Sequence, residues 1–202
     1  KPDNPPLKKE FNASTLPALM KTAGYRTGII GKLHVEPAAD FPWDWMSKAK
    51  VAAKPTQDVK WVAEQSRAFF TSAREAKQPF FYYVNFFDPH GPYTPEVDQV
   101  AGVPESPVRP QDVTEPYPLR APTEAAQKRV TATIINTIRR VDVGVGLLLD
   151  ELQSAGFAAN TLVVFLSDNG GTASGRNAPL SGNKGSTFEG GIRVPGLVRW
   201  PG

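Results

Sequence analysis

Hydrophobic and polar positions along the chain form a pattern that predicts strands separated by helices. Apolar runs of strand length occupy 25–30, 80–87, 161–166 and 191–199. The runs at 80–87 and 161–166 are apolar at nearly every position, which is typical of strands buried on both faces of a sheet. Strands that alternate with helices predict an α/β fold, with a mostly parallel sheet sandwiched by helices.

Two of the helices are indicated by their apolar spacing and their end signals. The segment 14–23 has Ser14 as a candidate cap, Pro17 in the tolerated first turn, and Gly24 where the helix ends. The segment 59–76 carries an apolar stripe at helical spacing. Its members are Val59, Val62, Ala63, Phe69, Phe70 and Ala73.

A long helix is predicted to begin after Thr123 and to end at Gly156. Its apolar positions recur every three or four residues: Val130, Ile134, Ile135, Ile138, Val141, Val145, Leu148, Leu149 and Leu152. Gly144 and Gly146 lie inside this pattern, where each costs about 1 kcal/mol relative to alanine. We therefore expect close packing or a break at these glycines.

Composition narrows the class of protein. The 202 residues include 23 Lys and Arg against 20 Asp and Glu, a net charge of +3, and 40% are hydrophobic. Three surplus charges over the whole length argue against nucleic-acid binding, which usually needs a clustered basic patch. Cysteine is absent from the sequence, which excludes a disulfide framework, a thiolate zinc site and a cysteine nucleophile within these residues. No apolar run approaches the roughly 20 residues of a membrane span.

Polar residues that could carry chemistry follow the predicted strands directly. Lys32 and His34 come after the first strand, His90 after the second, and Asp168 and Asn169 after the third. Ligands of parallel sheets bind at the carboxyl ends of strands. The oxygens of Asp168 and Asn169 suit Ca²⁺ or Mg²⁺, but the same pair beside two glycines equally fits an Asx turn. Two ligands are also too few, because Ca²⁺ takes about six to eight.

A fourth cluster surrounds Lys184, within the segment 182–187. It resembles half of a phosphate-binding P-loop, but an earlier glycine is missing and a loop precedes it, so nucleotide binding is rejected. The Lys184 ammonium is a suitable partner for sulfate or phosphate. The segment 172–176 is interpreted as a loop whose Arg176 contacts substrate. These clusters favour hydrolysis or transfer of an anionic ester, although none of the hydroxyl or carboxylate groups is a convincing nucleophile.

Four motifs resemble the sulfatase family of the alkaline-phosphatase-like superfamily. They are 24–35 with its Gly-Lys-x-His-Val form, 86–90 with Asp-Pro-His, 166–171 with Ser-Asp-Asn-Gly, and the lysine segment 182–195. The first looks most like heparan N-sulfatases, whereas the last is more typical of arylsulfatase-type members. The resemblance implies an α/β sandwich of the alkaline-phosphatase type that hydrolyses a sulfate ester or sulfamate.

The resemblance also assigns roles to individual residues. Asp168 and Asn169 would be calcium ligands, with Mg²⁺ less favoured. A formylglycine, made from Cys or Ser, would attack sulfur. The remaining site residues would act on the sulfate: Lys32 and His34 would hold the formylglycine and sulfate, and His90 and Lys184 would contact the sulfate, one of them protonating the leaving group.

The motifs that are missing suggest what the chain represents. We expect residues 1–202 to be the central part of one sulfatase catalytic domain, without the N-terminal nucleophile segment and the C-terminal subdomain. Alone it should be inactive and should expose strand edges and apolar surface. The expected substrate is a small sulfated sugar or aryl sulfate, and relatives of this kind are periplasmic, secreted or lysosomal.

Two other functions remain open from the sequence. One is a phosphate or phosphonate monoester hydrolase of the same superfamily. The other is a non-catalytic domain that binds anions or glycans, with Trp43 and Trp45 stacking on sugar rings. For these tryptophans, packing within their loop is the favoured interpretation.

Overall fold

The structure is a computed structural model of the chain and describes residues 7–33, 35, 37–47, 57–91, 107–117, 122–173 and 175–201. Its contacts divide the chain into two compact units. The first is formed mainly by Lys1–His90 and Arg140–Ala155, and the second mainly by Val103–Arg139 and Gly156–Gly202. Among the described residues, none of the helices is long and apolar enough to cross a membrane.

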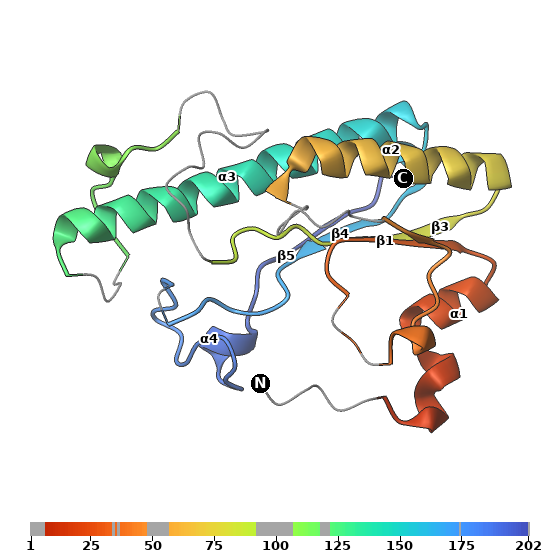
Figure 1. The fold of residues 1–202 in the computed structure, drawn as a ribbon, viewed down its shortest axis with the longest axis horizontal. Coiled ribbons are helices and arrows are strands. Elements are labelled where there is room, and N and C mark those ends of the chain that lie inside the picture. Colours follow the sequence, from red (N-terminus) through yellow and green to blue (C-terminus); the bar gives the residue numbers. More distant parts are fainter. Residues whose placement is uncertain are drawn as a thin grey trace. The chain divides into compact units, whose positions relative to one another are not determined.

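The first unit is built on a three-stranded parallel sheet in the order β2-β1-β3. Its elements are α1 (Leu16–Thr22), β1 (Arg26–Ile30), β2 (Trp45–Met46), α2 (Val59–Ala76) and β3 (Phe80–Val84). Helices α1 and α2 lie on opposite sides of this sheet (Figure 1). The expected parallel sheet is thus confirmed here, with β3 three residues shorter than predicted and β2 not predicted at all.

Helix α2 has the predicted bounds, and its apolar stripe faces the interior. The Asp58 carboxylate accepts hydrogen bonds from the backbone N–H groups of Lys60 and Trp61, at 3.1 and 3.0 Å, and so caps the first turn. All six residues of the predicted stripe are buried. Lys77 ends the helix in the left-handed conformation, with φ of 53°.

The start of α1 differs from the prediction by one residue. The helix begins at Leu16, so Thr15 rather than Ser14 precedes it. The Thr15 hydroxyl does not cap the helix but donates to the carbonyl oxygen of Asp40 at 2.7 Å.

Close packing against α2 explains the glycine in the middle of β1. A Cβ on Gly28 would lie 2.4 Å from the Cε2 atom of Phe69. The Phe69 ring also stacks on Tyr82 of β3, with ring centroids 4.3 Å apart. The absence of a side chain at Gly28 therefore lets α2 approach the sheet closely.

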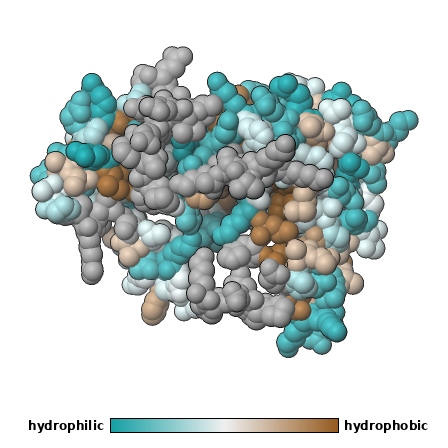
Figure 2. All heavy atoms as spheres, in the orientation of Figure 1, coloured by the Kyte–Doolittle hydropathy of each residue, from teal (hydrophilic) through white to brown (hydrophobic). Residues whose placement is uncertain are grey.

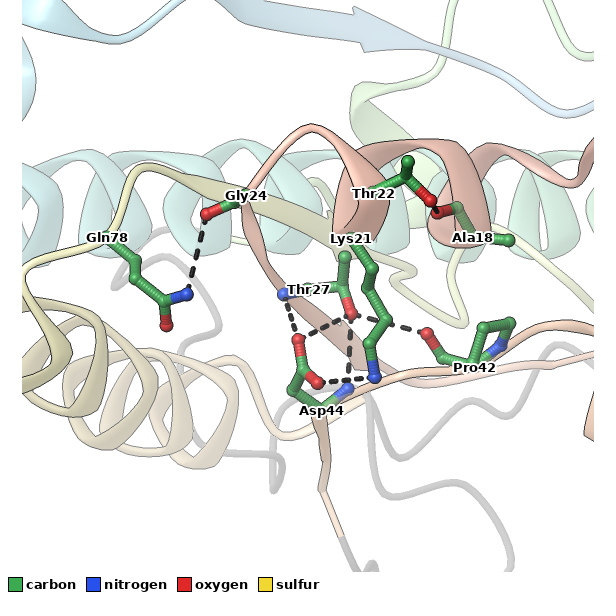
Figure 3. Close-up of polar contacts among 8 residues, drawn as sticks. All are labelled: Ala18, Lys21, Thr22, Gly24, Thr27, Pro42, Asp44 and Gln78. Carbon is green, nitrogen blue, oxygen red and sulfur yellow. Dashed lines mark hydrogen bonds and ion pairs between the residues drawn. The ribbon is translucent and has the colours of Figure 1, made fainter. Parts of the chain in front are cut away.

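A partly buried hydrogen-bond cluster ties β1 to the loop before β2 (Figure 3). Thr27 is fully buried, and its backbone N–H and hydroxyl both donate to Oδ2 of Asp44, at 2.8 and 3.1 Å. The Nζ atom of Lys21 in α1 lies 2.6 Å from Oδ1 of the same carboxylate. Burial raises the pKa of Asp44, but the hydrogen bonds from Lys21 and Thr27 outweigh it and lower the pKa below its usual value.

Trp43 of that loop and Trp45 of β2 pack on neighbouring aromatic side chains. Trp43 stacks on Phe81 and Tyr83, with centroid distances of 5.9 and 6.4 Å. Trp45 contacts Phe69 and Tyr82. The tryptophans are therefore packed against other side chains, as favoured, but these belong to the sheet and α2 rather than to the loop, and the contacts remove the main support for a sugar-stacking platform.

Helix α3 (Glu124–Ser154) is continuous through both predicted break points. A Cβ on Gly144 would lie 2.8 Å from Val59 of α2, whereas Gly146 has open space around it. Close packing, and no break, is therefore the outcome at Gly144. The Thr123 hydroxyl accepts from the N–H of Ala126 at 3.2 Å, as expected for the cap.

The predicted apolar stripe of α3 is only partly correct. Ile138 is 47% exposed, while Arg140 is 1% exposed. Polar residues on the buried face bind other segments of the chain. The Asn136 side chain pairs with the backbone of Val108 through two hydrogen bonds, of 2.8 and 2.9 Å. A hydropathy pattern does not predict that this face is buried, because its polar side chains are buried through hydrogen bonds to other segments.

The second unit contains a two-stranded antiparallel sheet of β4 (Val163–Leu166) and β5 (Gly196–Arg199). The last strand was predicted from 191, but residues Glu189–Ile192 form the short helix α4. That prediction was wrong, because Gly190 and Gly191 are buried against neighbouring backbone, as described below.

Large apolar side chains are exposed in the described structure, as expected. On β4 and β5 they include Val164, Leu166, Leu197 and Val198, each more than half exposed. On the face drawn in Figure 2, hydrophobic surface forms small patches among hydrophilic residues.

Candidate active site

The turn that carries Lys32 is fixed to the end of β3. Because β1 and β3 are parallel, with Ile30 beside Val84, their carboxyl ends lie at the same edge of the sheet. The side-chain amide of Asn85 donates to the carbonyl oxygen of Lys32 at 3.1 Å. Gly31 has φ of 96°, and a Cβ there would lie 2.4 Å from the Asn85 carbonyl oxygen, so this turn requires glycine. The Lys32 turn and the segment that leads to His90 therefore lie side by side.

His90 follows β3 at the end of a short turn. Its backbone N–H donates to the carbonyl oxygen of Phe87 at 3.1 Å, and its ring lies 5.1 Å from the Phe87 ring. His90 itself is exposed. His34, the second predicted histidine, lies outside the described residues.

Asp88, which precedes His90 by two residues, is not an open carboxylate. Its side chain is 2% exposed and forms an ion pair with the guanidinium of Arg140. The Arg140 Nε donates to Oδ2 at 2.6 Å, and the Gln57 amide donates to Oδ1 at 2.8 Å. Since both oxygens are occupied, Asp88 serves the structure of the turn.

The Asp168 and Lys184 segments are joined by backbone hydrogen bonds. The N–H of Lys184 donates to the carbonyl oxygen of Gly171 at 2.8 Å, and the N–H of Gly170 donates to that of Gly191 at 2.9 Å. The structure thus brings Lys184 to the turn that holds the predicted metal ligands Asp168 and Asn169.

Glycines allow close backbone packing between the two segments and within the lysine segment. A Cβ on Gly170 would lie 2.1 Å from the Gly190 carbonyl oxygen. A Cβ on Gly190 would meet the Gly182 carbonyl oxygen at 2.2 Å, and one on Gly191 would meet that of Ser186 at 2.3 Å. Backbone therefore packs directly on backbone around the Asp168 turn.

The side chains of this turn are available to a ligand. Asp168 and Lys184 are exposed. Within the described ranges, neither these two side chains nor that of Asn169 has a hydrogen-bond or ion-pair partner. Oxygen donors beside an ammonium can hold a divalent cation and an oxyanion together.

Arg176, predicted to contact substrate, pairs with an acidic side chain. Its Nη2 lies 3.0 Å from Oε2 of Glu115, and both side chains are more than half exposed. This pair links the 107–117 segment to the loop after Asn169 within the second unit.

The predicted site residues are divided between the two units. Lys32 and His90 belong to the first, and the second holds Asp168, Asn169, Lys184 and Arg176. Within each unit the structure joins segments that are far apart in the sequence.

The comparison with known families decides what these residues belong to. The sulfatase family model matches residues 4–202. The chain belongs to the sulfatase family. The curated relatives include the N-sulphoglucosamine sulphohydrolase of Homo sapiens, 34% identical over 174 residues, which cover 77% of this chain and 34% of that protein. The sulfatase chain therefore spans about a third of the length of this relative.

Solved structures show the same fold. The crystal structure of i-CgsB in complex with k-i-k-neocarrahexaose matches with a TM-score of 0.65 at 22% identity, over 98% of this chain and 50% of that one. A 2-O GAG sulfatase matches with a TM-score of 0.64 at 19% identity, over 100% of this chain and 49% of that one. The sulfatase therefore has the α/β, alkaline-phosphatase-like fold that its motifs imply.

Sequence reasoning missed two side chains that shape the turn before His90 in the candidate site. Gln57 and Arg140 enclose Asp88, yet neither was assigned a role. Arg140 lies on the buried face of α3, one helical turn before the tightly packed Gly144. A charged residue in that position was the available signal, because a buried arginine requires an acidic partner.

Proposed function

We propose that the protein hydrolyses a sulfate ester or sulfamate of a sugar. Family membership supports this reaction, and the human relative is named for the hydrolysis of a sulphated glucosamine. The observation that carries the proposal is the hydrogen bond between Lys184 and Gly171, which places a lysine beside the Asp168 turn. A lysine next to hard oxygen ligands suits an anionic sulfate group bound to a cation.

The cation that we propose is Ca²⁺, held in part by Asp168 and Asn169. Their carboxylate and amide oxygens fit a hard cation and are free of intramolecular partners within the described residues. The described part of the chain contains no group of three or more His, Cys, Asp or Glu side chains that could hold a metal. The remaining ligands must therefore come from other residues. When bound, the ion would stabilise negative charge on a sulfate oxygen.

The cationic side chains divide the remaining work. In this proposal, Lys32 and His34 orient the sulfate and the formylglycine nucleophile. His90 and Lys184 contact the sulfate, and one of them donates a proton to the leaving oxygen. Charge that develops on the sulfate oxygens in the transition state would be stabilised by these preorganised donors.

The test uses the protein at its full natural length, with 4-nitrophenyl sulfate and 4-nitrophenyl phosphate as matched esters. We expect the sulfate to be preferred, activity to be lost with a calcium chelator, and Ca²⁺ to restore it. Asp168→Ala and Lys184→Ala should each lower kcat/KM about 100-fold or more. The matched controls Asp150→Ala and Lys60→Ala, at exposed positions on α3 and α2, should stay within about twofold. Preference for the phosphate, or full activity of Asp168→Ala, would refute the proposal.

A further inference from the structure

We propose that Arg140 is a positioning residue for His90, acting through the buried ion pair with Asp88. The inference rests on the proposed function only for the role of His90 in the reaction. Its structural part concerns the turn from Phe87 to His90, whose last residue is exposed while its second residue is buried.

The ion pair of Asp88 and Arg140 is buried. The side chains of Asp88 and Arg140 are each 2% exposed. Two guanidinium nitrogens of Arg140 contact Oδ2 of Asp88, and Gln57 donates to Oδ1 at 2.8 Å. Charged groups so deeply buried persist only with a partner of opposite charge, so each fixes the position of the other.

The turn from Phe87 to His90 is held both by its backbone and by the Asp88 side chain. Asp88 is followed by Pro89 and then His90, whose backbone N–H closes the turn on Phe87. The His90 ring contacts the Phe87 ring, and His90 is exposed. Because Asp88 fastens the turn to α3 and to Gln57, it sets the position of the backbone from which the imidazole extends.

The shape of the Arg140 guanidinium explains why arginine occupies this position. Its planar guanidinium presents Nε and Nη2 together to one carboxylate, which a lysine ammonium cannot do. The remaining nitrogen, Nη1, is buried and has no hydrogen-bond partner within the described residues. Asp88 is therefore the acidic group that compensates the Arg140 charge among the residues described.

The kinetic test is a double-mutant cycle in the full-length protein, with 4-nitrophenyl sulfate. Arg140→Lys should lower kcat/KM about 10- to 100-fold in the wild type, because small displacements of a catalytic group are costly. In a His90→Ala background the same substitution should change kcat/KM less than about twofold. Losses that multiply would show that Arg140 does not act through His90. Arg67→Lys, which alters the ion pair between the exposed Arg67 of α2 and Glu151 of α3, is the matched control and should have little effect.

A second measurement does not depend on activity. In ¹⁵N NMR of the imidazole groups, the His90 signals are assigned by their loss in His90→Ala. We expect Arg140→Lys to shift or broaden these signals and Arg67→Lys to leave them unchanged. If Arg140→Lys fails to fold, Gln57→Ala removes a single hydrogen bond to Asp88 and should cause a smaller change of the same kind.

The two measurements separate the possible failures. Unaltered His90 signals in a folded Arg140→Lys or Gln57→Ala variant would overturn the inference. A wild-type protein that cleaves no sulfate ester would refute the proposed function, while the NMR signals would still decide whether Arg140 positions His90.

Discussion

Replacing Gly170 with alanine should separate the two segments that meet at the Asp168 turn. The added Cβ would lie 2.1 Å from the carbonyl oxygen of Gly190 and 2.9 Å from its carbonyl carbon. An ordinary contact needs more than 3 Å, so the backbones must move apart by about 1 Å. That movement would stretch the 2.9 Å hydrogen bond between Gly170 and Gly191 beyond its useful range.

The magnitude follows from these two effects. Overpacking of a rigid contact costs about 1–3 kcal/mol, and a lost hydrogen bond costs about 1 kcal/mol. We therefore expect Gly170→Ala to lower the free energy of unfolding by about 2–4 kcal/mol. The assay is urea unfolding in the presence of a chelator, so that bound metal does not contribute.

A matched substitution provides the control. Gly146→Ala adds the same methyl group where nothing lies within 4 Å, and in a helix it should stabilise by about 0.5–1 kcal/mol. If Gly170→Ala unfolded at the same urea concentration as the wild type while Gly146→Ala behaved as expected, the backbone contact between Gly170 and Gly190 would not be rigid, which would refute this prediction.

Two further predictions concern the first unit. Gly144→Ala should lower the free energy of unfolding by about 1 kcal/mol, because the added Cβ would lie 2.8 Å from Val59. Gly146→Ala meets no such contact, so equal stability of the two alanine variants in urea would contradict this packing. Asp44→Asn should lower the free energy of unfolding by about 1 kcal/mol at pH 7, because it removes the ion pair with Lys21 and weakens the hydrogen bonds from Thr27. Burial raises the pKa of Asp44, but the hydrogen bonds outweigh burial and leave the folded pKa below the unfolded value of 3.8. The stabilisation by Asp44 is therefore complete above pH 3.8 and is lost as the pH falls through the lower folded pKa. Unfolding curves between pH 5 and pH 2 should show the two proteins converging below the unfolded value of 3.8, and a difference that stays constant over this whole range would argue against the ion pair.

Local signals in the sequence predicted the first unit well. Helix α2 has a carboxylate cap at Asp58 and an apolar residue at every turn, so its bounds were predictable to the residue. Strand β2 has two residues and no alternation, and pairing with β1 alone defines it. The last strand was predicted five residues too long, because Gly190 and Gly191 pack against the backbone of Gly182 and Ser186, and hydropathy does not register such contacts.

The site was predictable as motifs but not as a set of partners. The positions of Lys32 and Asp168 at strand ends followed from the order of elements alone. The distinction between Asp88 and Asp168 did not, because both are acidic residues just after a strand. Only the structure shows that Asp88 is enclosed by Arg140 while Asp168 is exposed. The ion pair that buries Asp88 joins residues 52 positions apart, which no local sequence pattern can predict.

That separation has a consequence for synthesis of the chain on the ribosome. Asp88 emerges 52 residues before Arg140, and at about 5–20 residues per second the delay is about 3–10 s. During this interval Arg140 has not yet been synthesised, so the Asp88 carboxylate lacks its ion-pair partner and stays hydrated. The Asp88 turn therefore reaches its final form only after α3 has been made, even though β1, α2 and β3 are translated earlier.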